Sequence, residues 1–219
     1  FFIVPAACSV ASRAVSYLQS LGIDPYVIGA CIQARILYES CKYHNCVFVG
    51  RDKAGKARSA FLRGTFGDFK QEAAGSEKAF SFFLPAKDPE SRRLAVAEGA
   101  IDTLSLASLV KMGGDSWQDC HYLSLGGTAP AALLQFLRDH PSVTEISLCL
   151  DNDKAGLEGI DRLTAAIRKE PELSGRIALI YPNPPPKEYG KDYNLYLTAQ
   201  MKQRKVQREK QAPPKGAER

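Results

Sequence analysis

Three acidic residues stand directly after stretches of sequence that have the pattern of buried strands. Glu98 follows the apolar run 94–97, and Asp151 with Asp153 follows the run 143–150. If these runs are parallel strands, their carboxyl ends meet at one sheet edge, where ligands bind in such sheets. Three carboxylates there repel one another unless a cation or protons compensate, and Mg²⁺ prefers oxygen ligands of this kind. The sequence therefore predicts a divalent metal site at that edge.

Each of these acidic residues also has a simpler interpretation, with Asp151 as a helix cap and Glu98 as a solvated strand end. Two other chemistries of Asp-x-Asp pairs are excluded by the residues that follow. A dehalogenase-type phosphatase needs Thr at position 155, and a calcium loop needs an oxygen ligand there and Glu at 162. The chain has Ala155 and Arg162. The joint pattern of strand–Glu–Gly and strand–Asp–x–Asp favours the metal site.

Strands and single helices are expected to alternate through the second half of the chain. Such alternation predicts a parallel sheet with right-handed crossovers. The glycine turn at Gly127 and Thr128 would present amides at a helix start, where anions bind well. The expected strands cover 94–97, 121–125, 143–150 and 176–181, and the expected helices cover 100–112, 130–138 and 155–168.

Four segments of this half carry a specific pattern: VAEGAIDTLS at 96–105, LGGT at 125–128, LCLDNDKAG at 148–156 and GKDYNLYL at 190–197. The first and third resemble the two signature motifs of TOPRIM domains, and the second resembles the glycine turn of that family. The fourth resembles a segment that often closes TOPRIM domains of phage and plasmid primases. These domains are the catalytic domains of bacterial-type primases, type IA and II topoisomerases and several nucleases. The resemblance covers roughly residues 91–198.

The resemblance implies a role for each matching residue. Glu98 would be the general acid/base or a metal ligand, and Asp151 and Asp153 would coordinate Mg²⁺ or Mn²⁺. The metal would then neutralise charge on phosphate oxygens during an in-line displacement. Asp102 and Asp192 match further acidic positions, although each also fits a helix cap. The supporting positions are Asp102, Gly127, Lys154, Lys191 and Asp192.

The first half predicts a smaller α+β domain. Helices are expected over 9–21 and from Asp24-Pro25 to about Tyr38, followed by strands at 46–49 and 57–62 around a turn at 52–55 and a further strand at 79–84. The segments 37–39, 44–52, 63–65 and 75–78 resemble an uncharacterised domain that precedes TOPRIM in proteins of bacterial mobile elements.

The distribution of charge says more than its total of +5, which comes from 29 basic and 24 acidic residues. Residues 199–219 hold seven basic and two acidic side chains, so the remainder of the chain is neutral. That tail is expected to continue the last helix briefly and then to be disordered. Within the neutral part, the hairpin region is basic, which suggests a nucleic-acid contact or simply a solvated surface. The proposed contacts are Arg51, Arg58, Arg63 and Lys78.

The six cysteines are scattered through a chain large enough to build a core without disulfides, and no secretory signal is recognisable. A reducing, cytoplasmic setting is therefore expected. Only Cys41, His44 and Cys46 resemble a ligand cluster, and without a second ligand pair a zinc site is not expected there. No apolar run reaches the ~20 residues that span a bilayer. The start at Phe1 without Met predicts a fragment.

The predicted fold is α/β: a TOPRIM domain, that is, a compact Rossmann-like parallel sheet with flanking helices, at 89–198. A smaller α+β domain at 1–88 precedes it, and a basic, disordered tail at 199–219 follows. The function expected from the resemblance is primase-like nucleotidyl transfer in a mobile element. DNA, as a single-stranded template, and nucleotides would be its partners, with other replication or mobilisation proteins besides. A TOPRIM nuclease and a non-catalytic DNA-binding accessory module remain open as alternatives.

Overall fold

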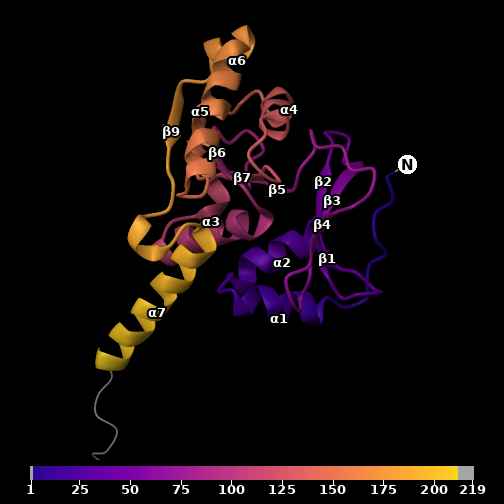
Figure 1. The fold of residues 1–219 in the computed structure, drawn as a ribbon, viewed down its shortest axis with the longest axis vertical. Coiled ribbons are helices and arrows are strands. Elements are labelled where there is room, and N and C mark those ends of the chain that lie inside the picture. The colour runs from indigo at the N-terminus through magenta and orange to yellow at the C-terminus, as the bar shows by residue number, and fades with distance from the viewer. Residues whose placement is uncertain (1, 212–219) are drawn as a thin grey trace, which may run out of the picture.

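The computed structural model describes residues 2–211, which form two β-sheets with helices packed against them (Figure 1). Residues 37–72 supply a four-stranded antiparallel sheet, and residues 83–182 supply a five-stranded sheet that is parallel except at one edge. This mixed α/β architecture, with its parallel second sheet, confirms the predicted fold class.

Local sequence signals explain most elements of the first half. Asp24 caps the second helix, because its carboxylate accepts the Tyr26 amide at 2.8 Å and Pro25 occupies the first helical position. The predicted hairpin is confirmed, and Asp52 holds its turn by accepting the amides of Ala54 and Lys56. The elements are α1 (Ser12–Ser20), α2 (Pro25–Gln33), β1 (Leu37–Glu39), β2 (Cys46–Arg51), β3 (Ala57–Arg63) and β4 (Lys70–Glu72).

Helix α2 is shorter than the sequence predicts, and the expected continuation to Tyr38 is wrong. The helix ends at Gln33, and Arg35 then adopts a left-handed backbone conformation with φ of 55°. The chain reverses there, so that Leu37 and Tyr38 pair with Phe48 and Val47 as strand β1. Apolar and aromatic residues fit a half-buried sheet edge at least as well as a helix, and tertiary pairing decides between them.

The second half follows the predicted alternation of strands and helices. Its strands lie in the order β5-β7-β6-β8-β9, and only the edge strand β5 is antiparallel. The short helix α6 was not anticipated. The elements are β5 (Phe83–Leu84), β6 (Arg93–Ala97), α3 (Ala100–Gly113), β7 (His121–Ser124), α4 (Ala131–Asp139), β8 (Glu145–Leu148), α5 (Lys154–Lys169), α6 (Pro171–Arg176), β9 (Leu179–Pro182) and α7 (Tyr193–Gln211), with 3₁₀ turns at Trp117–Asp119 and Lys187–Tyr189.

The segment before β5 links the two sheets. The strand predicted at 79–84 forms only at its end, where Phe83 and Leu84 pair with β7, while Phe82 bridges to Gly50 of β2. A side chain at Gly50 would collide with the carbonyl oxygen of Phe80, so a glycine is needed for this close passage. Residues 83–84 thus belong to the second sheet, although they lie before the predicted domain boundary at 88.

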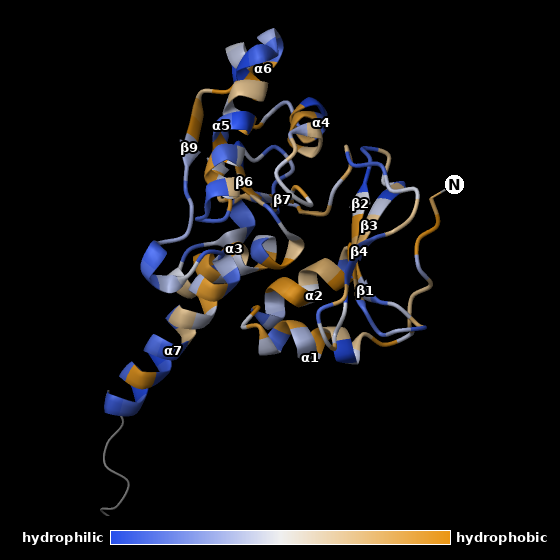
Figure 2. Cartoon of the chain, in the orientation of Figure 1, coloured by the Kyte–Doolittle hydropathy of each residue, from blue (hydrophilic) through white to orange (hydrophobic). Residues whose placement is uncertain are grey.

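A continuous hydrophobic core joins the two halves. Leu18 of α1, Val27 of α2 and Phe48 of β2 belong to the same buried cluster as Leu104 of α3 and Leu197 of α7. Helix α2 is largely hydrophobic and packs against both β1 and α3 (Figure 2). Because side chains from both halves are buried in this core, the first sheet is held in a fixed position beside the second.

Helix α7 extends further than the sequence predicts. It begins at Tyr193 and continues to Gln211, whereas the helix was expected to end soon after Thr198. The extension is rich in Gln, Lys and Arg, which are good helix formers, and no Gly or Pro interrupts it. Residues 212–219, the rest of the predicted disordered tail, lie outside the described residues. In the described part of the chain, no helix is both long and apolar enough to cross a membrane.

Candidate active site

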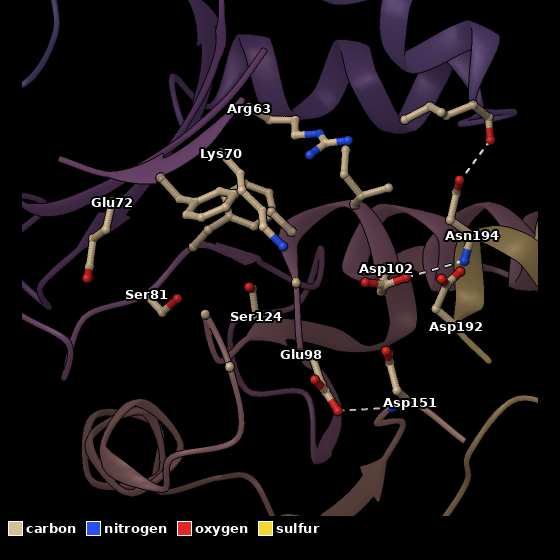
Figure 3. Close-up of a pocket in the computed structure, with 18 of the residues that line it drawn as sticks. Arg63, Lys70, Glu72, Ser81, Glu98, Asp102, Ser124, Asp151, Asp192 and Asn194 are labelled. Atoms are coloured by element: carbon tan, nitrogen blue, oxygen red, sulfur yellow. Dashed lines mark hydrogen bonds between the residues drawn. The ribbon is translucent and has the colours of Figure 1, made fainter. Parts of the chain in front are cut away.

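A cavity of about 710 Å³ lies between the carboxyl edge of the second sheet and the first half of the chain (Figure 3). Its floor carries acidic residues from the strand ends and from the turns after them. Its opposite wall carries basic and aromatic residues from the first half. The residues used in the argument below are Tyr17, Phe61, Arg63, Lys70, Glu98, Asp102, Gly127, Asp151, Asp192 and Asn194.

The ends of three neighbouring strands are locked together around Glu98. The Asp151 amide, beyond the end of β8, donates to Oε1 of Glu98 at 3.2 Å. The Gly127 amide, beyond β7, donates to the Glu98 backbone carbonyl at 3.0 Å. The structure therefore brings Glu98, Asp151 and Gly127 together, as the parallel topology required.

The first turn of α5 fixes the position of Asp151 and Asp153. Asp153 is the N-cap of α5, with Oδ1 accepting the Gly156 amide at 3.0 Å. Gly156 is buried and packs so tightly that an added Cβ would collide with the carbonyl oxygen of Asp151. Glycine at this position therefore lets the helix start directly beneath the acidic loop.

Lys191 is the cation nearest to the two aspartates in the described chain. Its Nζ lies 3.6 Å from Oδ2 of Asp151 and 3.8 Å from Oδ2 of Asp153. Its backbone is tied to the same loop, because the Asn152 amide donates to the Lys191 carbonyl at 2.6 Å. The Asn152 side chain also donates to the Pro185 carbonyl at 2.8 Å. The segment that leads into α7 is thereby fastened to the acidic loop.

Two further carboxylates, Asp102 and Asp192, lie beside this group. Oδ1 of Asp102 accepts the Asn194 amide at 3.3 Å, and Oδ1 of Asp192 accepts the Leu195 amide at 2.7 Å, near the start of α7. The Asn194 side chain donates to Ser105 at 3.0 Å and to the Leu21 carbonyl at 2.9 Å. Asn194 thus joins α7, α3 and the first half at the cavity. It was not named as a site residue from the sequence, although it lies in the GKDYN segment that resembles primase TOPRIM domains.

The carboxylates influence one another's ionisation. Burial, together with the charges of Asp192, Asp151 and Glu98, raises the pKa of Asp102 to about 7. Burial and the charge of Asp151 raise the pKa of Glu98. Burial also raises the pKa of Asp151, although Lys191 opposes the shift. Neighbouring like charges with too little compensation are the condition that a bound cation relieves.

The opposite wall presents a different set of side chains. Arg63 of β3 points into the cavity, and its Nε donates to the Tyr17 hydroxyl of α1 at 3.0 Å. Lys70 comes from β4, a strand whose three residues are all exposed. Neither Lys70 nor Tyr17 was singled out from the sequence, because β4 is polar throughout and Tyr17 lies far from Arg63 in the chain.

The other predicted contacts lie away from this cavity. Arg58 is ion-paired with Asp52 at 2.7 Å and with Glu77 at 3.1 Å. Arg51 donates to two backbone carbonyls. Lys78 lines a smaller neighbouring cavity of about 160 Å³. Lys154 is almost fully exposed and lies 3.8 Å from Glu158. Of the four basic residues proposed to bind nucleic acid, the structure therefore brings only Arg63 to the acidic site.

An acidic edge on a parallel sheet of this order is the arrangement of a Toprim-like domain, and residues 95–197 match the family model described as Toprim-like. Residues 16–88 match a family described as a protein of unknown function, DUF3991. The chain therefore carries a region that matches the DUF3991 family, followed by a region that matches the Toprim-like family.

One curated relative and several solved structures resemble the chain. The uncharacterized protein pXO2-78 of Bacillus anthracis is 30% identical over 200 residues, which cover 83% of this chain. The chain spans only 56% of that protein.

The structural neighbours are primase catalytic cores. The primase fragment of the bacteriophage T7 primase-helicase has a TM-score of 0.59 at 16% identity, over 87% of this chain and 72% of that one. The E. coli primase catalytic core has a TM-score of 0.57 at 20% identity, over 94% and 75%. The DnaG primase catalytic domain bound to single-stranded DNA has a TM-score of 0.56 at 19% identity, over 94% and 74%. At these identities the likeness establishes the fold, which is that of a primase core.

Proposed function

We propose that this chain carries out metal-dependent nucleotidyl transfer on a DNA template, in the manner of a primase. The observation that carries the proposal is the convergence of Glu98, Asp151 and Asp153 at one sheet edge, where Glu98 and Asp151 line a cavity whose far wall bears Arg63 and Lys70. Acidic groups suit a divalent cation, and basic groups suit phosphate. Joining nucleotides requires both at one place.

The acidic residues fit a hard divalent cation such as Mg²⁺ or Mn²⁺. All the donors are carboxylate oxygens, and burial together with the neighbouring carboxylates raises the pKa values of Glu98 and Asp151. Glu98, Asp151 and Asp153 would hold the ion, with Asp102 and Asp192 beside it. When bound, it would neutralise negative charge on the phosphate oxygens that take part in the reaction.

The other steps of the reaction would be carried out by side chains of the protein. Glu98 is half-buried with a raised pKa, which suits a carboxylate that accepts a proton from an attacking hydroxyl. Lys191 is exposed and is held beside Asp151, so its ammonium group is placed to contact a phosphate. Arg63 and Lys70 face this site from the other wall and would bind the sugar–phosphate backbone of template or nucleotide.

Two structural neighbours support the choice of partners. One neighbour of similar fold was solved with single-stranded DNA, and another with an RNA/DNA hybrid and dTTP. We propose a single-stranded DNA template and nucleotides as the partners here, and replication of a bacterial mobile element in the cytoplasm as the setting.

The test is incubation of the protein with single-stranded DNA, ribonucleotides and Mg²⁺, followed by separation of products by size. New oligomers that depend on the template are expected. Glu98→Gln and Asp151→Asn should lower their yield by at least ~10²-fold, which is typical for loss of a group that stabilises the transition state. Asp161→Asn, an exposed carboxylate on α5, is the matched control and should leave the yield unchanged.

Three outcomes would contradict the proposal. A shortened template without new oligomers would identify a nuclease. DNA binding without either product would identify an accessory module. Full activity in both Glu98→Gln and Asp151→Asn would show that the chemistry occurs elsewhere.

A further inference from the structure

A second cluster of potential ligands lies in the first half, away from the acidic cavity. The segment before α1 pairs with the end of β1: Ala7 bridges Ser40, the Cys8 amide donates to the Glu39 carbonyl at 2.8 Å, and the Cys41 amide donates to the Ala6 carbonyl at 2.9 Å. Side chains alternate between the two faces of a sheet, so the residues before and after the Ala7–Ser40 pair all lie on the face opposite to that pair. Cys8, Glu39 and Cys41 therefore emerge on one face.

A tight turn brings His44 to the same place. The His44 amide donates to the Ser40 carbonyl at 3.0 Å, and the Thr65 hydroxyl donates to the His44 carbonyl at 2.9 Å. The backbone of His44 has φ of 54°, a conformation that residues other than glycine rarely adopt and that often marks a functional position. One ligand atom each from Cys8, Glu39 and His44 lies within 4.8 Å of the others.

Glu39 is prepared for such a role by its surroundings. It is only 2% exposed, and its Oε2 accepts the Ala14 amide of α1 at 2.9 Å. Its Oε1 contacts Nδ1 of His44. A carboxylate that orients a histidine in this way is the usual support of a metal-binding imidazole.

We propose that Cys8, Cys41 and His44, with Glu39, form a zinc site. Thiolate and imidazole ligands select zinc over the hard cations that suit the acidic cavity. Cys41 reaches the same face as Cys8 and Glu39 through the antiparallel pairing of residues 6–8 with residues 39–41. The site would fasten the N-terminal segment and the 40–45 turn to β1.

This assignment reverses the expectation from the sequence, which considered Cys41, His44 and Cys46 and found no second ligand pair. The missing ligand is Cys8, which is far away in the chain and arrives only through the pairing with β1. Cys46 is not part of the cluster, because it is fully buried and its Sγ lies 3.9 Å from the Ala14 carbonyl. The proposal does not depend on the function proposed for the acidic cavity.

The test begins with metal analysis of the full chain, purified under reducing conditions and supplied with Zn²⁺. One zinc per chain is expected, together with thiolate-to-metal charge-transfer bands when Co²⁺ replaces it. Cys8→Ser, Cys41→Ser and His44→Ala should each lower zinc affinity by ~10²-fold or more, since even residues that only support a ligand contribute about 10–100-fold. Cys120→Ser, a half-buried thiol outside the cluster, is the matched control and should bind zinc normally.

The wild-type Co²⁺ spectrum decides the question even if a variant fails to fold. Absence of sulfur bands, or zinc well below one per chain in the wild type, would overturn the proposal. Equal zinc content in the wild type and in folded Cys8→Ser would do the same. So would a Cys8–Cys41 disulfide that persists under those reducing conditions, because it would assign the pair a redox role in place of metal binding.

Discussion

The two walls of the cavity are built differently. The acidic wall consists of strand ends and helix starts whose backbone groups bind one another, as in the contacts that join Glu98 to Asp151 and Gly127. The basic wall consists of Arg63 on an inner strand and Lys70 on the exposed strand β4. The acidic wall is held in one arrangement by backbone hydrogen bonds, whereas on the basic wall Arg63 is held by a single side-chain hydrogen bond to Tyr17 and Lys70 is exposed. Chemistry at a phosphate needs groups in a fixed geometry, whereas binding a template of varied sequence needs only basic side chains that contact its backbone.

The walls also differ in electrostatic balance. Burial and the charges of neighbouring carboxylates raise the pKa values of the acidic groups, most clearly that of Asp102, which reaches about 7. On the first half, carboxylates are paired instead: Arg58 lowers the pKa of Asp52. The acidic wall thus holds buried carboxylates with raised pKa values, and each prediction below tests a consequence of the difference between the walls.

The largest expected effect concerns Asp102 and pH. Its pKa in the folded protein is raised, so its contribution to stability is fully present below about pH 4, the usual value for an unfolded Asp, and is lost as pH rises through about 7. Asp102→Asn removes this dependence. Without divalent metal, the free energy of unfolding of the variant relative to wild type should increase by roughly 4 kcal/mol between about pH 4 and about pH 8. Denaturant unfolding at a series of pH values measures it.

The control for this titration is Asp161→Asn, whose exposed side chain lies on α5. It should show no comparable pH dependence. Saturating Mg²⁺ should reduce the difference between Asp102→Asn and wild type, because a bound cation favours the ionised cluster. A pH-independent difference in metal-free protein would show that the acidic wall is not crowded with charge.

The next effect concerns backbone preorganisation. Gly156→Ala removes no carboxylate but introduces a Cβ that collides with the Asp151 carbonyl. The loop must move, and a displacement of about 1 Å at a reacting group costs on the order of 10²-fold in rate. Activity in the oligomer assay should fall by about that factor while DNA affinity is kept, since the basic wall is untouched.

Gly113→Ala provides the control for added bulk, because nothing lies within 4 Å of a Cβ built there. It should be fully active and, as a helical position, slightly more stable. Normal activity in Gly156→Ala would mean that the acidic loop tolerates movement and that its fixed geometry is not what the chemistry needs.

A smaller effect separates two arginines of one strand. Arg63 faces the cavity, while Arg58 is already paired with Asp52 and Glu77. Arg63→Ala should weaken binding of single-stranded DNA or nucleotide about tenfold, equivalent to about 1.4 kcal/mol, and should lower the salt dependence of binding. Arg58→Ala should leave affinity within about twofold, because its charge is compensated. Fluorescence anisotropy at several salt concentrations distinguishes them, and equal losses would refute a basic wall centred on Arg63.

The acidic wall was predictable because topology alone decides it. Glu98 and Asp151 each follow a buried strand, and parallel strands place such residues at one edge whatever their separation in sequence. The need for glycine at position 156 was not predictable, since its close contact with the Asp151 carbonyl exists only once the first turn of α5 has formed. The motif contains this glycine, but the sequence does not show that the backbone of Asp151 leaves no room for a side chain there.

Arg63 of the basic wall was predicted from the sequence, but Lys70, Tyr17 and the cysteine cluster were not, and for a common reason. Lys70 lies on a strand that is exposed on every residue and therefore lacks a hydrophobic period. Tyr17, which binds Arg63, and Cys8, which faces Glu39, are brought in by long-range pairing that no local pattern encodes. The same competition between local pattern and long-range pairing explains why residues 37–39 form β1 rather than the end of α2.

The smallest effect concerns the C-terminal extension of α7, which adds positive charge without belonging to either wall. From Lys202 onward its described side chains are exposed, and Met201 is also exposed in part but packs near Gly22. Truncation after Met201 should preserve thermal stability and reduce affinity for single-stranded DNA about two- to threefold at low salt, and less at high salt. Replacing Lys202, Arg204, Lys205 and Arg208 by Gln keeps the helix-forming composition and should produce much of the same loss. Equal affinity of the truncated and full chains at low salt would show that the cavity walls alone account for DNA binding.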